Sequence, residues 1–347
     1  MSLGQVPGIK ADSANADVGT PAARRPATSK RAKALRVSVA LGDYDRTRAL
    51  LYGQVGAEGL DLKVVSAPIG EFCVRPVYEE YDVAETSFSW YVAARSRGER
   101  VIALPIFPLR MAVLGYQFVR ADSPYKSPKD LIGKRVATSS YRATVNLWLR
   151  GIMKDQWGVT PDQIKWVTAR PEAQNFIVPE GVSCTLMAGR KQGELLLAGE
   201  VDAVMGPEAP AEFNAGHPGI RRLLPDSWAE THDYYTRTHI VPITHTVVMS
   251  EALYDKKPWI AERLLTAFTE AQKACDSFHL NSKHVSFPDA EFFMEQQRKF
   301  YGRDPWKHGI AANRHVIETF TRYAFDQGYT VKHQPIEELF TPNLMES

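Results

Sequence analysis

Residues 35–51 form a strand-like run that leads through a turn into a helical pattern, the order of elements from which α/β folds are built. The run LRVSVAL alternates apolar residues and predicts a buried strand, which GDYD interrupts before a helical pattern over 47–51. In an open α/β sheet, ligands bind at the carboxyl ends of the strands. We therefore expect Asp43, Tyr44 and Arg46 to line a ligand-binding crevice. The alternative is an ordinary turn in which an aspartate caps the helix and pairs with the arginine.

The same alternation continues along the first third of the chain. Apolar runs at 59–65 and 101–107 predict further strands, and we expect a short helix over 72–81 between them. Strand–helix–strand order builds a parallel sheet. Between the two runs, DVAETSFSWY passes from an apolar segment into a polar turn. We expect Glu85 and Ser87 of this turn to face the same crevice as Asp43.

A second α/β unit follows in the middle of the chain. Its turn SSYRAT, residues 139–144, precedes an amphipathic helix that we expect over 145–156. A helix start rich in Ser and Thr can hold an anion with its backbone N–H groups. Tyr141, Arg142 and Thr144 are therefore candidate substrate-binding residues. Farther along this unit, residues 170–190 are irregular, and their pattern predicts neither a helix nor a strand.

The last third of the chain is mainly helical. An apolar run at 246–249 predicts a strand that returns to the first sheet, so that two connections join two lobes. Helical patterns follow at 258–278, 289–300 and 313–327, and these helices most simply pack across the first lobe. The sequence thus predicts a disordered tail poor in large apolar residues, a first lobe built from both ends of the chain, and a second lobe between them. The expected bounds are 1–34 for the tail, 35–113 and 244–347 for lobe 1, and 114–243 for lobe 2.

Charge and hydropathy limit the kinds of partner. The net charge is +2 with both signs mixed along the chain, whereas a nucleic-acid-binding face would carry a basic stripe. No apolar run approaches the length of a membrane span. We therefore expect a small-molecule partner, and neither nucleic acid nor membrane.

The cysteines and the N-terminal residues bear on location. Cys73, Cys184 and Cys275 lie far apart, without a CxxC motif, and we find no histidine at a metal-ligand spacing from them. The sequence therefore predicts neither a disulfide framework nor a structural zinc site, and no other transition metal. It leaves open a divalent ion held by Asp or Glu. The pair Arg24-Arg25 is not followed by the apolar region of an export signal, so we expect a cytoplasmic protein.

Segments spread along the chain resemble a known family. They are GDYDRT, ETSFSWY, PIFPLR, LIGKRVATSSYRATVNLWLRGIM, YYTRTHIVPITHTVVM and the C-terminal GRDPWKHGIAANRHVIETFTRYAFDQG. Together they resemble the 4,5-dihydroxyphthalate decarboxylase family from about residue 35 to residue 344. That family is similar to the type II periplasmic binding proteins. The resemblance implies an α/β fold of two lobes joined by two hinge strands, with the ligand held between the lobes.

The resemblance also implies a carboxy-lyase that converts 4,5-dihydroxyphthalate to protocatechuate and CO2 in the degradation of aromatic compounds, without a cofactor. Such a reaction needs a proton for the ring carbon that loses its carboxylate, and a group that accepts a phenolic proton. His245 is the candidate donor, because imidazole titrates near neutral pH and this residue fits the family's histidine. Asp43 and Glu85 are the candidate acceptors. The alternative for His245 is an ordinary core histidine.

A dianionic aromatic substrate needs cationic and aromatic partners. Arg46, Arg110 and Arg142 are expected at turns that face the other lobe, and a guanidinium pairs a carboxylate through two hydrogen bonds. The alternative for each is a structural ion pair. Tyr44 and Tyr141 are expected to sandwich the substrate ring, unless they belong to the core.

Two other functions remain open at this point. The fold that the resemblance implies also serves a non-catalytic protein that binds a small carboxylate for an ABC-type transporter. A different lyase or a dehydratase is the other possibility, because residues 111–114 replace an aromatic-Arg-His stretch that the family carries. The sequence contains no GxSxG, GxxxxGK[ST] or GxGxxG motif. It leaves open whether the chain forms a homo-oligomer.

Overall fold

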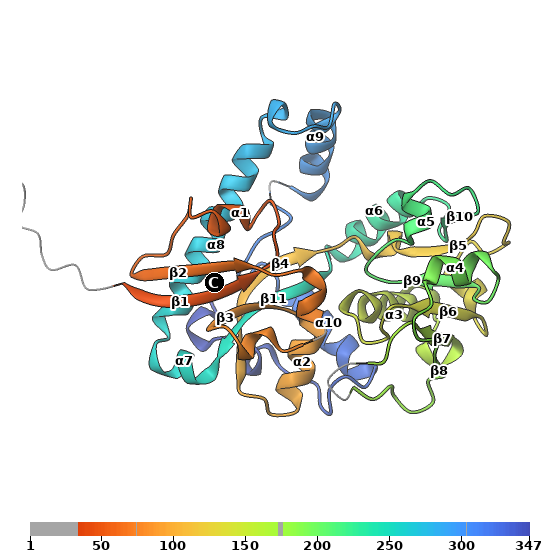
Figure 1. The fold of residues 1–347 in the computed structure, drawn as a ribbon, viewed down its shortest axis with the longest axis horizontal. Coiled ribbons are helices and arrows are strands. Elements are labelled where there is room, and N and C mark those ends of the chain that lie inside the picture. The colour runs from red at the N-terminus through yellow and green to blue at the C-terminus, as the bar shows by residue number, and fades with distance from the viewer. Residues whose placement is uncertain (1–33, 74, 173–175, 303) are drawn as a thin grey trace, which may run out of the picture. The chain divides into compact units, whose positions relative to one another are not determined.

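The structure is a computed structural model that describes residues 34–347 except 74, 173–175 and 303. The predicted tail at 1–34 therefore lies outside the described residues, apart from Ala34. Two β-sheets with helices around them make up the described part of the chain (Figure 1).

The first sheet is built from both ends of the chain. Its strand order is β2-β1-β3-β11-β4, in which β1 pairs parallel with β2 and β3, and β11 pairs antiparallel with β3 and β4. The predicted return of the chain to this sheet is thereby confirmed. The bounds are β1 Leu35–Leu41, β2 Leu60–Ser66, β3 Val83–Ser87, β4 Val101–Arg110 and β11 Ile243–Ser250.

The second sheet comes from the middle of the chain and has the strand order β10-β5-β9-β6-β7-β8. Its bounds are β5 Gln117–Arg120, β6 Arg135–Thr138, β7 Lys165–Thr168, β8 Cys184–Leu186, β9 Ala203–Met205 and β10 Ile220–Arg222. The chain passes between the sheets twice, from β4 to β5 and from α6 to β11. Contacts nevertheless join residues 34–347 into one unit, so the lobe boundaries stay a prediction.

The longer helices lie where the sequence pattern predicted them. Their bounds are α1 Arg48–Leu51, α2 Phe88–Ser96, α3 Thr144–Trp157, α4 Gln192–Leu197, α5 Ala211–Asn214, α6 Ser227–Thr238, α7 Glu251–Lys256, α8 Trp259–His279, α9 Ala290–Tyr301 and α10 Arg314–Asp326. A short helix expected over 72–81 is instead two 3₁₀ turns, at Ile69–Cys73 and Val77–Glu79. Pro76 lies between them, and a proline disfavours the helical conformation in the residue before it.

Helix α10 packs against both α2 and α3, and thereby lies between elements next to the two sheets. A Cβ built on Gly151 of α3 would come within 2.2 Å of the Tyr323 ring of α10, so only glycine permits this approach. The Phe320 ring of α10 stacks on Phe88 of α2 with centroids 4.4 Å apart. Helix α8 covers the first sheet, where Leu264 and Phe268 pack with strand residues in one apolar cluster.

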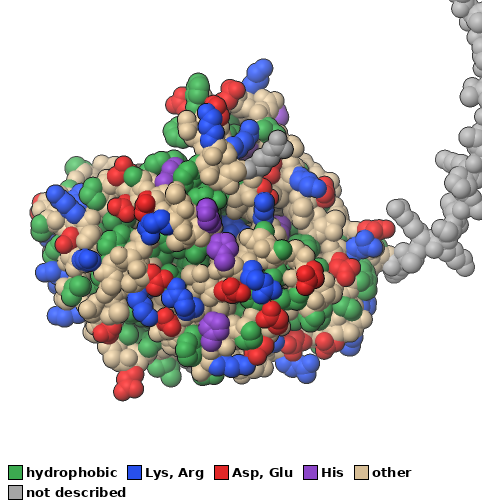
Figure 2. Space-filling model, turned by 180° about the vertical axis from the view of Figure 1, so that it is seen from behind, with side chains coloured by type: hydrophobic (Ala, Val, Ile, Leu, Met, Phe, Trp, Pro, Cys, Tyr) green, Lys and Arg blue, Asp and Glu red, His purple; other side chains and the backbone are tan. Residues whose placement is uncertain are grey.

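The surface agrees with the mixed charge of the sequence. Positively and negatively charged side chains intermingle over the face seen in Figure 2. Among residues 34–347 with the gaps given above, we find no helix that is both long and apolar enough to cross a membrane.

Candidate functional site

The turn after β1 folds back on itself and aims Tyr44 at the neighbouring strand. The Thr47 hydroxyl donates to the carbonyl of Gly42 at 2.6 Å and accepts from the Tyr44 N–H at 3.0 Å. A Cβ built on Gly42 would lie 2.4 Å from the Tyr44 ring, so glycine is needed for the ring to lie across the turn. The Tyr44 hydroxyl then donates to Oε1 of Glu85 at 2.7 Å.

Glu85 is the centre of a buried polar cluster, which we call the Glu85 triad and which consists of Tyr44, Glu85 and His245. The Glu85 side chain is fully buried on β3, and a carboxylate in such a place needs partners for both oxygens. Oε1 accepts from Tyr44 and lies 2.5 Å from Nδ1 of His245, while Oε2 accepts from the Gly42 N–H at 3.0 Å. Three neighbouring strands thus bring the triad together.

His245 reaches Glu85 because the pairing of β11 is irregular at this point. Residue 245 lies opposite Ser87 of β3, and the register between β11 and β4 shifts on both sides of residue 245. Such shifts re-aim side chains and are frequent beside active sites. The His245 side chain is 4% exposed, and the Phe72 ring meets its imidazole edge-on with centroids 6.3 Å apart.

The chemistry available to the triad is proton transfer. A carboxylate on Nδ1 fixes the orientation of an imidazole and stabilises its protonated form. The other nitrogen, Nε2, is then the atom suited to deliver a proton. The triad can therefore pair a proton donor, His245, with a carboxylate that positions it. The sequence predicted His245 as the donor, but it predicted Glu85 as an acceptor of a phenolic proton and not as the partner of His245.

Hydrogen bonds between hydroxyl groups join the start of α2 to the start of α3. The Ser87 Oγ lies 2.7 Å from the Thr144 Oγ1, and the Ser89 N–H donates to the same Thr144 oxygen at 3.1 Å. Ser87 precedes α2 and Thr144 is the first residue of α3, so two helix N-termini meet here. Both ends carry partial positive charge, which favours an anion nearby.

Arg142 is a buried cation next to the start of α2. Its guanidinium carbon lies 3.4 Å from the centre of the Trp90 ring, and its backbone carbonyl accepts from the Ser89 hydroxyl at 2.9 Å. Stacking on an aromatic face is a geometry that arginine favours. The sequence pattern indicated Arg142 but not Trp90.

The turn before α3 holds a carboxylate of the chain itself. Glu172 accepts from the Ser140 hydroxyl at 2.7 Å and from the backbone N–H groups of Tyr141 and Arg142, at 2.5 and 3.3 Å. The sequence predicted that this turn could bind an anion, and the structure places an internal one there. Glu172 lies in the segment for which the sequence pattern indicated no element.

The other two predicted arginines have different surroundings. Arg46 lies between two aromatic rings. Its guanidinium carbon is 4.3 Å from the centre of the Tyr44 ring and 4.7 Å from the centre of the Trp306 ring. Its Nε also donates to the Pro108 carbonyl. Arg46 therefore stands behind the triad, against the face of the tyrosine that contacts Glu85.

Arg110 ties β4 to distant parts of the chain. It donates to the carbonyls of Val241 and Lys307, at 3.3 and 2.8 Å, and to Oδ1 of Asn313 at 2.6 Å. Burial lowers the pKa of Arg110 to about 10. These contacts support the structural alternative more than a role in carboxylate binding.

Two further predicted site residues, Asp43 and Tyr141, have partners outside the Glu85 triad. Asp43 is exposed and forms an ion pair with Arg48, with 2.9 Å between oxygen and nitrogen. Tyr141 is fully buried, its ring lies 3.8 Å from the Arg150 guanidinium, and burial raises the pKa of its phenol. The structure thus gives Asp43 a surface position and Tyr141 a core position.

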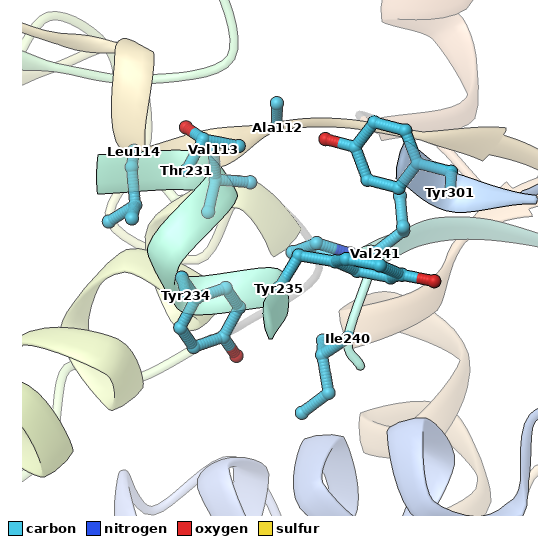
Figure 3. A pocket seen from close by; sticks show the side chains of 10 residues that line it. Ala112, Val113, Leu114, Thr231, Tyr234, Tyr235, Ile240, Val241 and Tyr301 are labelled. Atoms are coloured by element: carbon cyan, nitrogen blue, oxygen red, sulfur yellow. The ribbon is translucent and has the colours of Figure 1, made fainter. Parts of the chain in front are cut away.

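Cavities lie on two sides of this region. One of about 700 Å³ is bordered by Arg46 and Trp306, together with residues of α8 and α9. Another, of about 20 Å³, lies where the chain crosses between the sheets, and Figure 3 shows Tyr235 and Tyr301 beside it. The latter is too small for an aromatic acid, whereas the former can hold one.

Comparison with known proteins identifies relatives along most of the chain. Residues 57–275 match the family described as NMT1/THI5 like. A 4,5-dihydroxyphthalate decarboxylase from Comamonas testosteroni is 34% identical over 325 residues, which cover 90% of this chain and 98% of that protein. Another 4,5-dihydroxyphthalate decarboxylase, from Pseudomonas putida, is 31% identical over 215 residues, which cover 58% of this chain and 81% of that protein.

Solved structures with a similar fold include sulfonate-binding proteins. The periplasmic aliphatic sulphonate binding protein of Escherichia coli is 16% identical, with 91% of this chain and 99% of that chain covered and a TM-score of 0.52. A periplasmic sulfonate-binding protein of Methylobacillus flagellatus is 15% identical, with coverages of 90% and 93% and a TM-score of 0.53. At these identities the likeness concerns the fold alone. It confirms the predicted α/β fold of the type II periplasmic binding proteins.

Proposed function

The chain belongs to the 4,5-dihydroxyphthalate decarboxylase family, and on that premise we propose that it removes CO2 from 4,5-dihydroxyphthalate to give protocatechuate. The observation that carries the proposal is the Glu85 triad, a buried carboxylate–imidazole pair on neighbouring strands. A protein that only binds a carboxylate has no need of a positioned proton donor. This decarboxylation requires a proton for a ring carbon, and the triad contains a histidine that can donate one.

In the proposed reaction, the hydroxyl para to the departing carboxylate pushes electrons toward the ring carbon that bears it. The imidazolium of His245 delivers its Nε2 proton to that carbon and forms the new C–H bond. The bond from the ring to the carboxylate then breaks, its electron pair returns to the ring, and CO2 leaves. The net reaction consumes one proton, which His245 regains from solvent.

The other residues have supporting roles in this proposal. Glu85 stabilises the imidazolium, and Tyr44 positions Glu85 through its hydroxyl. Arg142 supplies a cation for the substrate's carboxylates, beside the hydroxyls of Ser87 and Thr144. Because His245 is 4% exposed, the side chains around it must move before a substrate reaches it.

The metabolic role and location are part of the proposal. We place the reaction in the degradation of aromatic compounds and in the cytoplasm, with a small aromatic carboxylate as the partner and no nucleic acid or membrane. Cys184 and Cys275 are free thiols, as is usual in a reducing compartment. Cell fractionation with an antibody to the chain tests the location.

The activity is tested by incubating the purified chain with 4,5-dihydroxyphthalate while ring absorbance and released CO2 are followed together. We expect protocatechuate and CO2 in equal amounts, and turnover about 10²–10⁴-fold slower with the His245→Asn variant. Tight binding of the dianion without CO2 release would overturn the proposal and favour the carboxylate-binding alternative. Release of water instead of CO2 would favour a dehydratase.

A further inference from the structure

Three side chains of the types that bind transition metals meet outside the Glu85 triad. They are Asp45 in the turn after β1 and Cys275 and His279 on α8, and one ligand atom from each lies within 4.8 Å of the other two. Around a tetrahedral zinc ion, ligand atoms about 2.0–2.3 Å from the metal lie within such distances of one another. We propose that Asp45, Cys275 and His279 form a metal site of the zinc class.

The spacing on α8 supports the site. Cys275 and His279 are four residues apart, so they project from the same face of the helix, one turn apart. Two histidines at this spacing on one helix bind zinc in the H-E-x-x-H motif. The expectation that no histidine lies at a metal-ligand spacing from a cysteine overlooked Cys275 and His279. The third ligand comes from a distant part of the chain, which the fold brings to the helix.

The aspartate is held in a suitable orientation. Its Oδ1 accepts from the backbone N–H of Arg46 at 2.8 Å and lies 3.2 Å from a guanidinium nitrogen of the same residue. Its Oδ2 instead faces His279, 3.2 Å from Nε2. Arg46 therefore occupies one oxygen and directs the other toward the imidazole, as supporting groups around metal ligands do. The simpler alternative is an ion pair between Asp45 and a protonated His279.

The thiol selects the kind of metal. An ion that binds must displace the thiol proton, which zinc does readily because it forms a strong bond to thiolate. Magnesium and calcium prefer oxygen ligands and would gain little from a thiol and an imidazole.

A metal ion held by these residues would lie beside open space. All three residues border the cavity of about 700 Å³, so the chain leaves room for water or a small oxygen ligand on the ion. Three protein ligands and one open position are the arrangement of reactive rather than purely structural zinc sites. The ion would also fasten the turn after β1 to α8. That turn carries Tyr44, so metal binding would stiffen the segment that positions Glu85.

The site is tested by metal binding to the full chain, without an affinity tag and after treatment with a chelator. Titration with Zn²⁺ in a calorimeter should give one tight ion per chain and raise the melting temperature. Titration with Co²⁺ should give a thiolate-to-cobalt charge-transfer band and the visible spectrum of tetrahedral coordination. Absence of stoichiometric binding of both metals would overturn the proposal.

Variants assign the ligands. Cys275→Ala should abolish the charge-transfer band, and His279→Ala should weaken Zn²⁺ binding by at least the 10–100-fold that loss of a supporting group costs. Cys184→Ala is the matched control, because its thiol is also free but lies on β8, and it should keep the band. A band that survives in Cys275→Ala, or that disappears in Cys184→Ala, would show that the metal binds elsewhere. Circular dichroism of each variant verifies that it is folded.

Discussion

Oε1 of Glu85 lies 2.5 Å from Nδ1 of His245, and neither side chain is more than slightly exposed. The two residues come from neighbouring antiparallel strands, β3 and β11, in which residue 245 is paired with Ser87. A buried carboxylate in this position orients the imidazole and leaves Nε2 to act on a ligand.

Replacement of His245 by asparagine should lower kcat by about 10²–10⁴-fold, because the amide keeps some hydrogen bonding but carries no transferable proton. Substrate affinity should change little, since the lost interaction belongs to the transition state. Steady-state kinetics, substrate binding by calorimetry and melting temperature are measured on the same preparations. Full turnover in a well-folded variant would remove His245 from the mechanism.

The matched control is His239→Asn. His239 ends helix α6 with φ 53°, a left-handed conformation that asparagine adopts readily. The control should therefore keep both stability and kcat, and a comparable loss of activity in it would show that the effect at residue 245 is not specific.

Tyr44→Phe removes one of the three donors to the Glu85 carboxylate and should destabilise the protein by about 1–3 kcal/mol, because a buried acceptor loses its partner. We expect kcat to fall as well, since Glu85 is less well positioned, while KM changes little. Denaturant unfolding and kinetics check this. Tyr52→Phe is the control, because Tyr52 is 66% exposed; equal effects in both variants would argue against a positioning role for Tyr44.

The sequence was sufficient for the parts of the fold that depend on local pattern. Alternating runs located β1 and β2, and long amphipathic stretches located α3, α8 and α10. It failed where the elements are short or depend on distant partners. Strand β8 has three residues and forms only by pairing with β7, which no pattern within 184–186 reveals.

The candidate site shows the same limit. The turn after β1 was correctly expected beside Glu85, but the pattern could not tell which residue of the turn points inward. Hydrogen bonds of Thr47 decide this in favour of Tyr44, and they leave Asp43 exposed beside Arg48. Likewise, nothing local indicates that Trp90 would meet Arg142, since the contact exists only once two helix starts converge.

Arg142→Lys tests whether the buried guanidinium binds substrate. Lysine keeps the charge but cannot stack on Trp90 or pair a carboxylate through two parallel bonds. We expect KM and the dissociation constant of a phthalate dianion to rise about tenfold or more, a loss of about 1.4 kcal/mol or more per substrate bound. Arg135→Lys serves as control, because Arg135 pairs with Asp202 at the surface. Unchanged affinity in Arg142→Lys would mean that Arg142 supports the fold rather than the substrate.

The last prediction concerns stability at low pH. His308 accepts the Phe107 N–H on Nδ1 at 3.1 Å, and its ring packs against Phe268. Burial lowers the pKa of His308 to about 3, and the charges of Arg110 and Arg46 contribute to this effect. The folded protein therefore keeps this imidazole neutral at pH values where the unfolded chain, with an ordinary histidine pKa near 6.5, binds a proton.

The sign follows from this difference in bound protons. Above about pH 6.5, His308 is neutral in both the folded and the unfolded state. Below that pH the unfolded state binds a proton and is stabilised by it, so the free energy of unfolding falls as the pH is lowered toward 3. Each pH unit costs at most about 1.4 kcal/mol, which amounts to about 3 kcal/mol between pH 6.5 and 4.5. In His308→Gln the side-chain oxygen can still accept the Phe107 N–H but does not titrate, so its stability should depend less on pH over this range. Denaturant unfolding at several pH values compares it with the wild type and with His315→Gln, an exposed histidine whose replacement should leave the slope unchanged. A wild-type slope that persists in His308→Gln would assign the acid sensitivity to other groups.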